Sequence, residues 1–247
     1  MDYFINYQMG LFGTFSNIKP SPENVSKLMT NLNNSNNDIK IRFIPSIIKA
    51  FNINIDESEF IYDDRIQMIT EDKVWSIDFL PNRIDINYSY KENNDKFYLL
   101  QDLNDISKEI SKIIESVIEK KFYRLAINCK MYIENMNNQD IQSYIRKLII
   151  PLKYYQEKEI INFNMNLQSK CELKINDIEE KINTITKLST DKIKIKDESI
   201  KLIAIFDINT SKDETKERFS TDNLNLFCDE VKKIINNLVE DIRSIEV

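Results

Sequence analysis

Strictly alternating apolar and polar residues mark several segments of the chain as strands. Residues 83–90 alternate in this way, residues 75–79 do the same just before them, and residues 80–82 suit a turn between the two. Further apolar faces recur at every second position in 125–133 and 161–167, whereas 200–208 is apolar on both sides. Strands with one apolar face are typical of antiparallel sheets, so the pattern predicts such a sheet with 200–208 in its interior.

Apolar residues three and four positions apart predict two long amphipathic helices, at 106–117 and at 227–242. Ser21, Pro22 and Glu23 form a typical start of a shorter helix. Ile141 and Ile145 mark a fourth helix, which should end before residue 151, a proline. Helices and antiparallel strands together predict an α+β fold.

The chain contains two similar segments at an offset near 121. Glu109, Lys112 and Glu119 correspond to Glu230, Lys233 and Glu240, and residues 85–87 resemble 207–209. We therefore expect two α+β halves, 1–121 and 122–247, each with the order strand, helix, antiparallel strands, long helix. A pseudo-twofold axis would relate them. Chance matching in a biased composition is the alternative.

Composition adds limits on location and partners. The 247 residues carry a net charge of −6, which argues against a surface dominated by nucleic-acid binding. No apolar run approaches the roughly 18 residues needed to cross a membrane, and no signal-peptide pattern opens the chain. Cys129, Cys171 and Cys228 are odd in number, far apart and set in apolar patterns. They predict buried, inert thiols and a reducing cytoplasm.

The types of residue available restrict the chemistry. The sequence has no histidine, which excludes histidine-dependent nucleophiles, proton shuttles and metal sites. It also has no Walker loop and no GxGxxG motif, and only two glycines, Gly10 and Gly13. Their surroundings predict a strand bulge or a close backbone contact. These observations favour a protein that is not an enzyme and holds no cofactor.

An acidic window, residues 56–78, is the best candidate for chemistry. It contains eight acids and two bases, so it alone carries a charge of −6. Carboxylates of this kind suit Mg²⁺ or Ca²⁺, and a metal-dependent hydrolase or nuclease would use Asp63, Asp64 and Asp72. The window could instead mimic a phosphate backbone, face a basic partner, or form a solvated hairpin edge whose charges discourage pairing.

Residues 59–70 are expected to form an open sheet edge at the surface. The candidate partner surface there consists of Phe60, Tyr62, Asp63, Asp64 and Met68. A twofold homodimer through this edge is the predicted assembly, because closed dimers are the commonest soluble oligomers.

Residues 122–135 resemble a strand in a sporadically distributed family of uncharacterised bacterial proteins of similar length. Arg124 is followed by a small residue, Ala126, as in that family. The family's Arg-Tyr-x-Asn segment is not matched, because no Arg-Tyr pair follows here. The resemblance implies no known activity.

Taken together, the sequence favours a non-enzymatic protein-interaction or accessory protein, with a role in bacterial or phage conflict (defence or anti-defence) as one hypothesis. The metal-dependent hydrolase or nuclease is one alternative. A small-ligand-binding module with a pocket between the two halves is the other, since interfaces between domains often hold ligands.

Overall fold

The structure is a computed structural model of residues 1–247. It describes residues 3–34, 41–54, 59–91, 98–133, 138–149, 151–192 and 200–245. Side chains are described for the same residues except 3, 51–54, 59–62 and 192.

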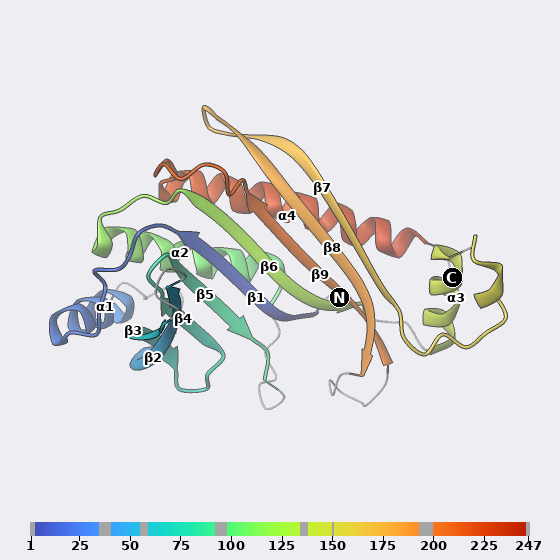
Figure 1. The fold of residues 1–247 in the computed structure, drawn as a ribbon, viewed down its shortest axis with the longest axis horizontal. Coiled ribbons are helices and arrows are strands. Elements are labelled where there is room, and N and C mark those ends of the chain that lie inside the picture. The colour runs from blue at the N-terminus through green and yellow to red at the C-terminus, as the bar shows by residue number, and fades with distance from the viewer. Residues whose placement is uncertain are drawn as a thin grey trace.

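The described chain folds as an α+β protein with four α-helices and one antiparallel sheet (Figure 1). The helices are α1 (Pro22–Asn34), α2 (Leu100–Ile118), α3 (Asn138–Leu148) and α4 (Thr221–Ser244), and a 3₁₀ turn, η1, spans Lys153–Tyr155. The strands are β1 (Tyr3–Phe12), β2 (Phe43–Asn54), β3 (Glu59–Thr70), β4 (Trp75–Phe79), β5 (Arg83–Ser89), β6 (Arg124–Ile133), β7 (Asn164–Ile175), β8 (Ile178–Lys192) and β9 (Ile200–Thr210). All four helices predicted from the sequence, three from apolar spacing and one from its start signal, are confirmed.

All nine strands join into a single sheet with the order β2-β3-β4-β5-β1-β6-β9-β8-β7. The expectation of two similar halves related by a pseudo-twofold axis is therefore wrong. β1 pairs with β5 on one side and with β6 on the other, so the sheet runs without a break across residue 121. Each of these strands would otherwise expose a row of unpaired backbone groups, and mutual pairing satisfies both rows.

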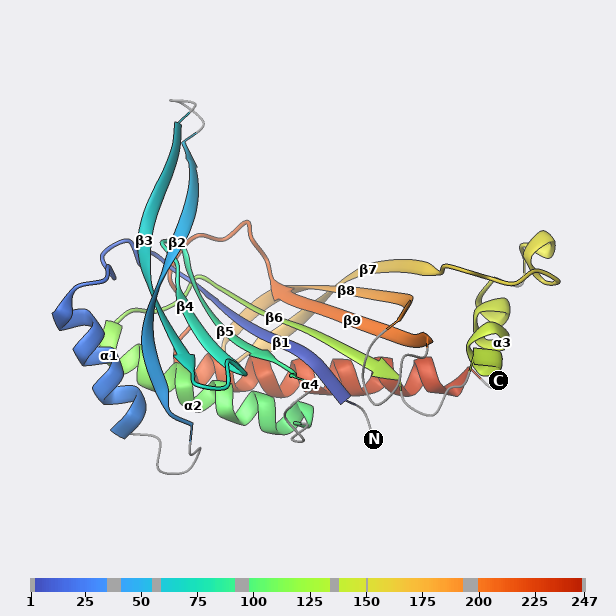
Figure 2. The same cartoon turned by 90° about the horizontal axis from the view of Figure 1, so that it is seen from below.

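The two long helices cover one face of this sheet, as Figure 2 shows. On β1, Tyr7 points to that face, and its hydroxyl donates a hydrogen bond to Asn104 Oδ1 of α2 at 2.8 Å. The amide of Asn104 in turn donates to the backbone carbonyl of Cys228 in α4 at 3.4 Å. At the surface, Lys108 of α2 pairs with Asp229 of α4 at 2.6 Å. The helices are thus tied both to the sheet and to each other.

The β2–β3 hairpin rises from the other face of the sheet (Figure 2). β3 pairs with β2 along its whole length, from Glu59 to Thr70, and with β4 near its end. The prediction that 59–70 forms an open edge is therefore wrong, because β2 covers it. The outer strands of the sheet are β2 and β7.

Gly13 lies just after β1, and the aromatic ring of Phe15 packs closely against it. A Cβ atom at this position would lie 2.4 Å from Phe15 Cζ, a distance that real side chains do not reach. The ring of Phe15 is fully buried, so it cannot simply move aside. The close neighbour of Gly13 is thus a side-chain ring and not the backbone contact expected from the sequence.

The burial of Met68 shows that β3 contributes to the core. The side chain is fully buried in the core, so the expectation that residues 60–68 all lie at the surface is wrong at this position. Met68→Asp places a carboxylate among apolar side chains and should lower the free energy of unfolding by roughly 3 kcal/mol or more. Asp64→Ala, at an exposed position of the same strand, should change it by less than about 0.5 kcal/mol. Urea denaturation of both variants measures the difference, and equal, small effects would contradict the burial of Met68.

Candidate functional site

The face of the sheet opposite α2 and α4, here called the open face, carries the polar half of the strand alternation. On β6, Leu125 and Ile127 are buried toward the helices, so the alternating Arg124, Ala126 and Asn128 belong to the open face. No described helix covers its central strands (Figures 1 and 2). A polar face left in solvent is usual for an antiparallel sheet, but here it also has a defined internal order.

The strand registers place one residue from each of eight strands in a single row across the open face. The pairs that define the row follow one another from β3 to β7 without a gap. In spatial order the row is Gln67, Asp78, Asp85, Gly10, Ala126, Asn209, Asn183 and Lys170. Acids lie toward one end, the two smallest residues lie at the centre, and amides and a lysine lie toward the other end.

Hydrogen bonds fix the acidic end of the row. Asp78 accepts from Gln67 Nε2 at 2.7 Å and from Asn87 Nδ2 at 3.0 Å. Asp85 pairs with Arg83 Nε at 2.9 Å. These side chains come from β3, β4 and β5, so the contacts hold three neighbouring strands in register.

Burial perturbs both carboxyl groups. Removal from water raises the pKa of Asp85 to about 6, although the positive charge of Arg83 opposes the change. Burial also raises the pKa of Asp78, against the opposing effect of its hydrogen bonds with Gln67 and Asn87. Because a carboxyl that titrates near pH 6 can exchange a proton close to physiological pH, Asp85 can respond to pH on this face.

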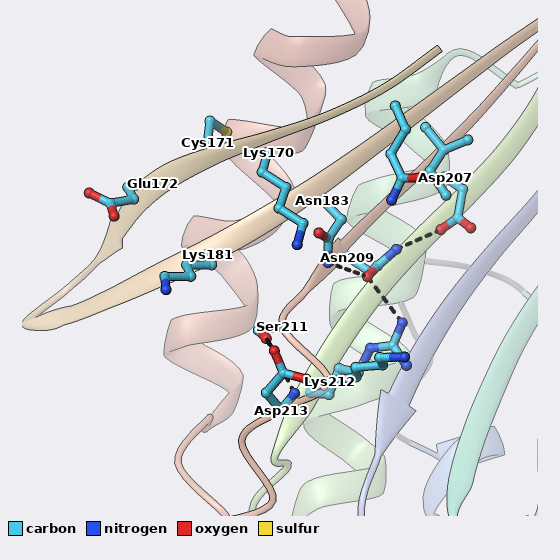
Figure 3. Close-up of a pocket in the computed structure, with 13 residues that line it drawn as sticks. Lys170, Cys171, Glu172, Lys181, Asn183, Asp207, Asn209, Ser211, Lys212 and Asp213 are labelled. Atoms are coloured by element: carbon cyan, nitrogen blue, oxygen red, sulfur yellow. Dashed lines mark hydrogen bonds between the residues drawn. The ribbon is translucent and has the colours of Figure 1, made fainter. Parts of the chain in front are cut away.

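The other end of the row is organised around Asn209. Its Oδ1 accepts hydrogen bonds from Arg124 Nη2 at 3.0 Å and from Asn183 Nδ2 at 3.3 Å, and its Nδ2 donates to Asp207 at 3.1 Å (Figure 3). The guanidinium of Arg124 also stacks on the ring of Phe12, with its Cζ 4.6 Å from the ring centroid. Arg124 is thus held in place by β1 and β9.

Two hollows open along the row, and both are lined by Arg124 and Asp207. The smaller has a volume of about 240 Å³ and lies over β5, β1, β6 and β9, with Gly10 and Ala126 among its lining residues. The larger has a volume of about 870 Å³ and lies over β6, β9, β8 and β7, beside residues 211–213. Small central residues leave the backbone of β1 and β6 accessible to a bound group.

The residues of the predicted partner surface do not all lie at the surface of the protein. Asp63 pairs with the buried Arg65 and lies 3.6 Å from the ammonium of Lys19. Asp64 is exposed and Met68 is in the core. The side chains of Phe60 and Tyr62 lie outside those that the structure describes. The surface as predicted stays a prediction, except that Met68 is not available to a partner in the folded protein.

The acids proposed for a metal site have other roles. Asp72 accepts hydrogen bonds from Thr70 Oγ1 at 2.6 Å and from the Val74 amide at 3.0 Å, which closes the turn between β3 and β4. Within the described parts of the chain, no three His, Cys, Asp or Glu side chains form a group that could hold a metal ion.

Two of the three cysteines are buried as expected. Burial raises the pKa of the Cys228 thiol to about 12 and also raises that of Cys129, so neither thiol is reactive near neutral pH. Cys171 is exposed and lines the larger hollow, so the expectation that it is buried is wrong. β7 is an outer strand with a mostly exposed side-chain pattern, and this explains the difference.

The sequence contained a signal for part of this site. Arg83, Asp85 and Asn87 occupy the polar positions of a strongly alternating strand, which is what assigns them to the open face. Their connection to Arg124 and Asn209 depends on pairing between distant strands, and no local pattern reports it. The site as a whole therefore cannot be recognised from the sequence.

Comparison with protein-family models, curated proteins and solved structures finds no match to this chain. The resemblance of residues 122–135 to a bacterial family therefore stays a prediction. Among the described residues, every helix is too short or too polar to span a lipid bilayer.

The raised pKa of Asp85 predicts a specific pH dependence of stability. Above pH 6 the folded protein holds a buried carboxylate that costs free energy, and below about pH 4 the carboxyl is protonated in both the folded and unfolded states. Asp85→Asn should therefore raise the free energy of unfolding by about 1–3 kcal/mol at pH 7.5 and by much less at pH 4.5. Urea denaturation at both pH values measures this.

Asp64→Asn is the control, because it removes the same charge from an exposed position of β3. It should change stability by less than about 0.5 kcal/mol at either pH. An equal effect of Asp85→Asn at both pH values would show that burial does not perturb this carboxyl.

Proposed function

We propose that this protein is a non-enzymatic binding protein that uses the open face of its sheet to hold a partner. One observation carries the proposal: a polar row eight strands wide crosses this face, no described helix covers its centre, and two hollows follow it. A sheet face that is merely exposed to solvent does not require its side chains to be hydrogen-bonded to one another in this way. Interlocked side chains of this kind suit a surface that presents fixed donors and acceptors to another molecule.

The side chains on the open face favour binding over catalysis. Asp207 and Asp78 accept hydrogen bonds from neighbouring amides, and Asp85 is paired with Arg83. The acids of the rival hydrolase hypothesis are engaged elsewhere: Asp63 with Arg65, and Asp72 in a turn. These contacts give the carboxylates structural partners, which supports a surface for recognition.

A protein partner suits the size and polarity of the face. Non-obligate interfaces are only about as apolar as ordinary surface, and they are rich in hydrogen bonds. The β2–β3 hairpin rises beside the open face and gives a partner a second element to contact (Figure 2). A role in bacterial or phage conflict remains a hypothesis from the sequence.

A small-ligand-binding module is the second candidate, and the smaller hollow favours it. This hollow lies where β1 and β6 meet, so its lining comes from both 1–121 and 122–247. Its lining includes Arg83, Asp85 and Arg124, which are charged, beside the small Gly10 and Ala126. A few convergent polar groups around a recess are typical of ligand sites.

Filling the smaller hollow with a large side chain tests whether the open face binds the partner. Asn128 lines it, and Asn128→Trp should block access and lower the amount of partner captured from a native host extract by about tenfold or more. Asn128 alternates with buried residues of β6, so the larger side chain projects away from the core.

Asn236→Trp is the matched control. Asn236 is exposed on α4, on the opposite side of the sheet from the open face, and lines neither hollow. Capture should fall less than about twofold with this variant. Unchanged capture by folded Asn128→Trp protein would refute the assignment of the open face, and co-purification of a small molecule without any protein partner would favour the second candidate.

Self-association is a further proposal, now through β2. This outer strand exposes Ile44 and Ile47, which are 46% and 62% exposed, and an apolar outer strand invites pairing with another chain. Ile47→Lys should abolish the dimer with less than about 0.5 kcal/mol change in stability, because the position is already in solvent. Light scattering decides it: a monomeric wild type at working concentration, or a dimeric Ile47→Lys variant, would contradict the proposal.

A further inference from the structure

The larger hollow gathers four cationic side chains from separate parts of the chain. Arg124 comes from β6, Lys170 from β7, Lys181 from β8, and Lys212 from the segment after β9. Lys170 lies beside the Asn183–Asn209 amide pair and Arg124 bonds to it, whereas Lys181 lies further toward the hairpin end, opposite Glu172 (Figure 3). Strands lie about 4.8 Å apart, so Lys170 is three strand spacings, roughly 14 Å, from Ala126 in the same row, and Arg124 lies two residues further along β6. Long side chains reaching inward from that distance can meet around a small molecule.

Within the described part of the chain, no carboxylate is paired with the lysines of this hollow. Among the described residues, Lys170, Lys181 and Lys212 form no ion pair. Three carboxylates also line the hollow, those of Glu172, Asp207 and Asp213, so four cations and three anions give it a net charge of +1. The whole chain carries −6, and the hollow is therefore a local reversal of sign.

The acids of the hollow are turned to other groups. Asp207 accepts a hydrogen bond from Asn209 at 3.1 Å, and Asp213 accepts one from Ser211 at 3.1 Å. Glu172 lies toward the hairpin end, away from the two amides (Figure 3). Among the described residues, Asp207 and Asp213 are each hydrogen-bonded to a neutral side chain and neither forms an ion pair with a cation of the hollow.

Arg124 is the preorganised member of the cluster. Its guanidinium is fixed by the Phe12 ring and by Asn209 Oδ1, while its Nε is buried and has no hydrogen-bond partner among the described residues. Arginine recognises phosphate through paired N–H groups, and lysine adds a mobile point charge.

We propose that the larger hollow binds a small molecule of nucleotide size that carries two or more phosphate groups. This inference rests on the proposed binding role of the open face and names a ligand class for one part of it. The volume of about 870 Å³ lies within the usual range for small-molecule sites. Several cations spread around the hollow suit a ligand with several anionic groups better than a single phosphate.

Titration calorimetry on the full chain, with pyrophosphate and ATP as separate probes, tests the proposal. Both probes should bind, and raising the salt from 50 to 200 mM should weaken binding, because ionic contacts are screened. Lys170→Glu/Lys181→Glu should lower the affinity at least tenfold. Lys170→Met/Lys181→Met, which removes the two charges without adding acids, should lower it at least threefold.

Lys112→Glu/Lys233→Glu is the control. These lysines are exposed on α2 and α4, and the double substitution changes the net charge by the same amount as Lys170→Glu/Lys181→Glu. Affinity should change less than about twofold. An equal loss in both glutamate variants would reduce the effect to general electrostatics and overturn the proposal.

Two other results would also overturn it: absence of binding by both probes, or equally tight binding of citrate, which has carboxylates in place of phosphates. Thermal unfolding of each variant shows whether it is folded. Failure here is separable from failure of the proposed function. If neither probe binds but Asn128→Trp still blocks partner capture, only the ligand class is wrong.

Discussion

Antiparallel pairing between β1 and β6 is the contact on which the rest of the structure depends. It joins Tyr3–Phe12 to Arg124–Ile133, with one irregularity between Phe4 and Asn6, and makes β1 an interior strand bonded on both sides. The pairing also sets where the long helices lie. Because Tyr7 of β1 bonds Asn104 of α2, and Asn104 bonds the backbone of α4, the two helices must share one face. The other face is then left for polar residues.

The helices and most of the strands could be predicted because each has a characteristic spacing of apolar residues within its own segment of the sequence. β8 shows where that fails. Its buried positions include Thr184 and Thr186, while Ile185 faces the open side. The alternation of apolar and polar residues in β8 therefore does not indicate which face is buried. The same limit applies to β3. Met68 alternates with polar residues, and this pattern is the same in an edge strand as in a strand that is paired on both sides.

The site could be predicted only in part, because its order comes from registers between strands far apart in the chain. Asp85 occupies a polar position in an alternating strand, yet it is only 4% exposed, and nothing local shows this. Gly10 pairs with Asp85 on one side and Ala126 on the other, an arrangement that exists only once β5, β1 and β6 are neighbours. The acidic window gave a stronger local signal, but Asp63 and Asp72 stabilise nearby structure.

The contrast between an acidic chain and a locally basic hollow bears on the size of ligand that can bind. Charges act over about 8–10 Å at physiological ionic strength, so a molecule inside the hollow senses mainly Arg124 and its neighbouring lysines. A long polyanion such as nucleic acid would extend beyond that distance over a surface whose sum is −6, and repulsion there would offset the local attraction. The hydrogen-bonded carboxylates of Asp207 and Asp213 narrow the attractive region further. The charge pattern thus selects for a compact anion that fits among the four cations and against an extended one.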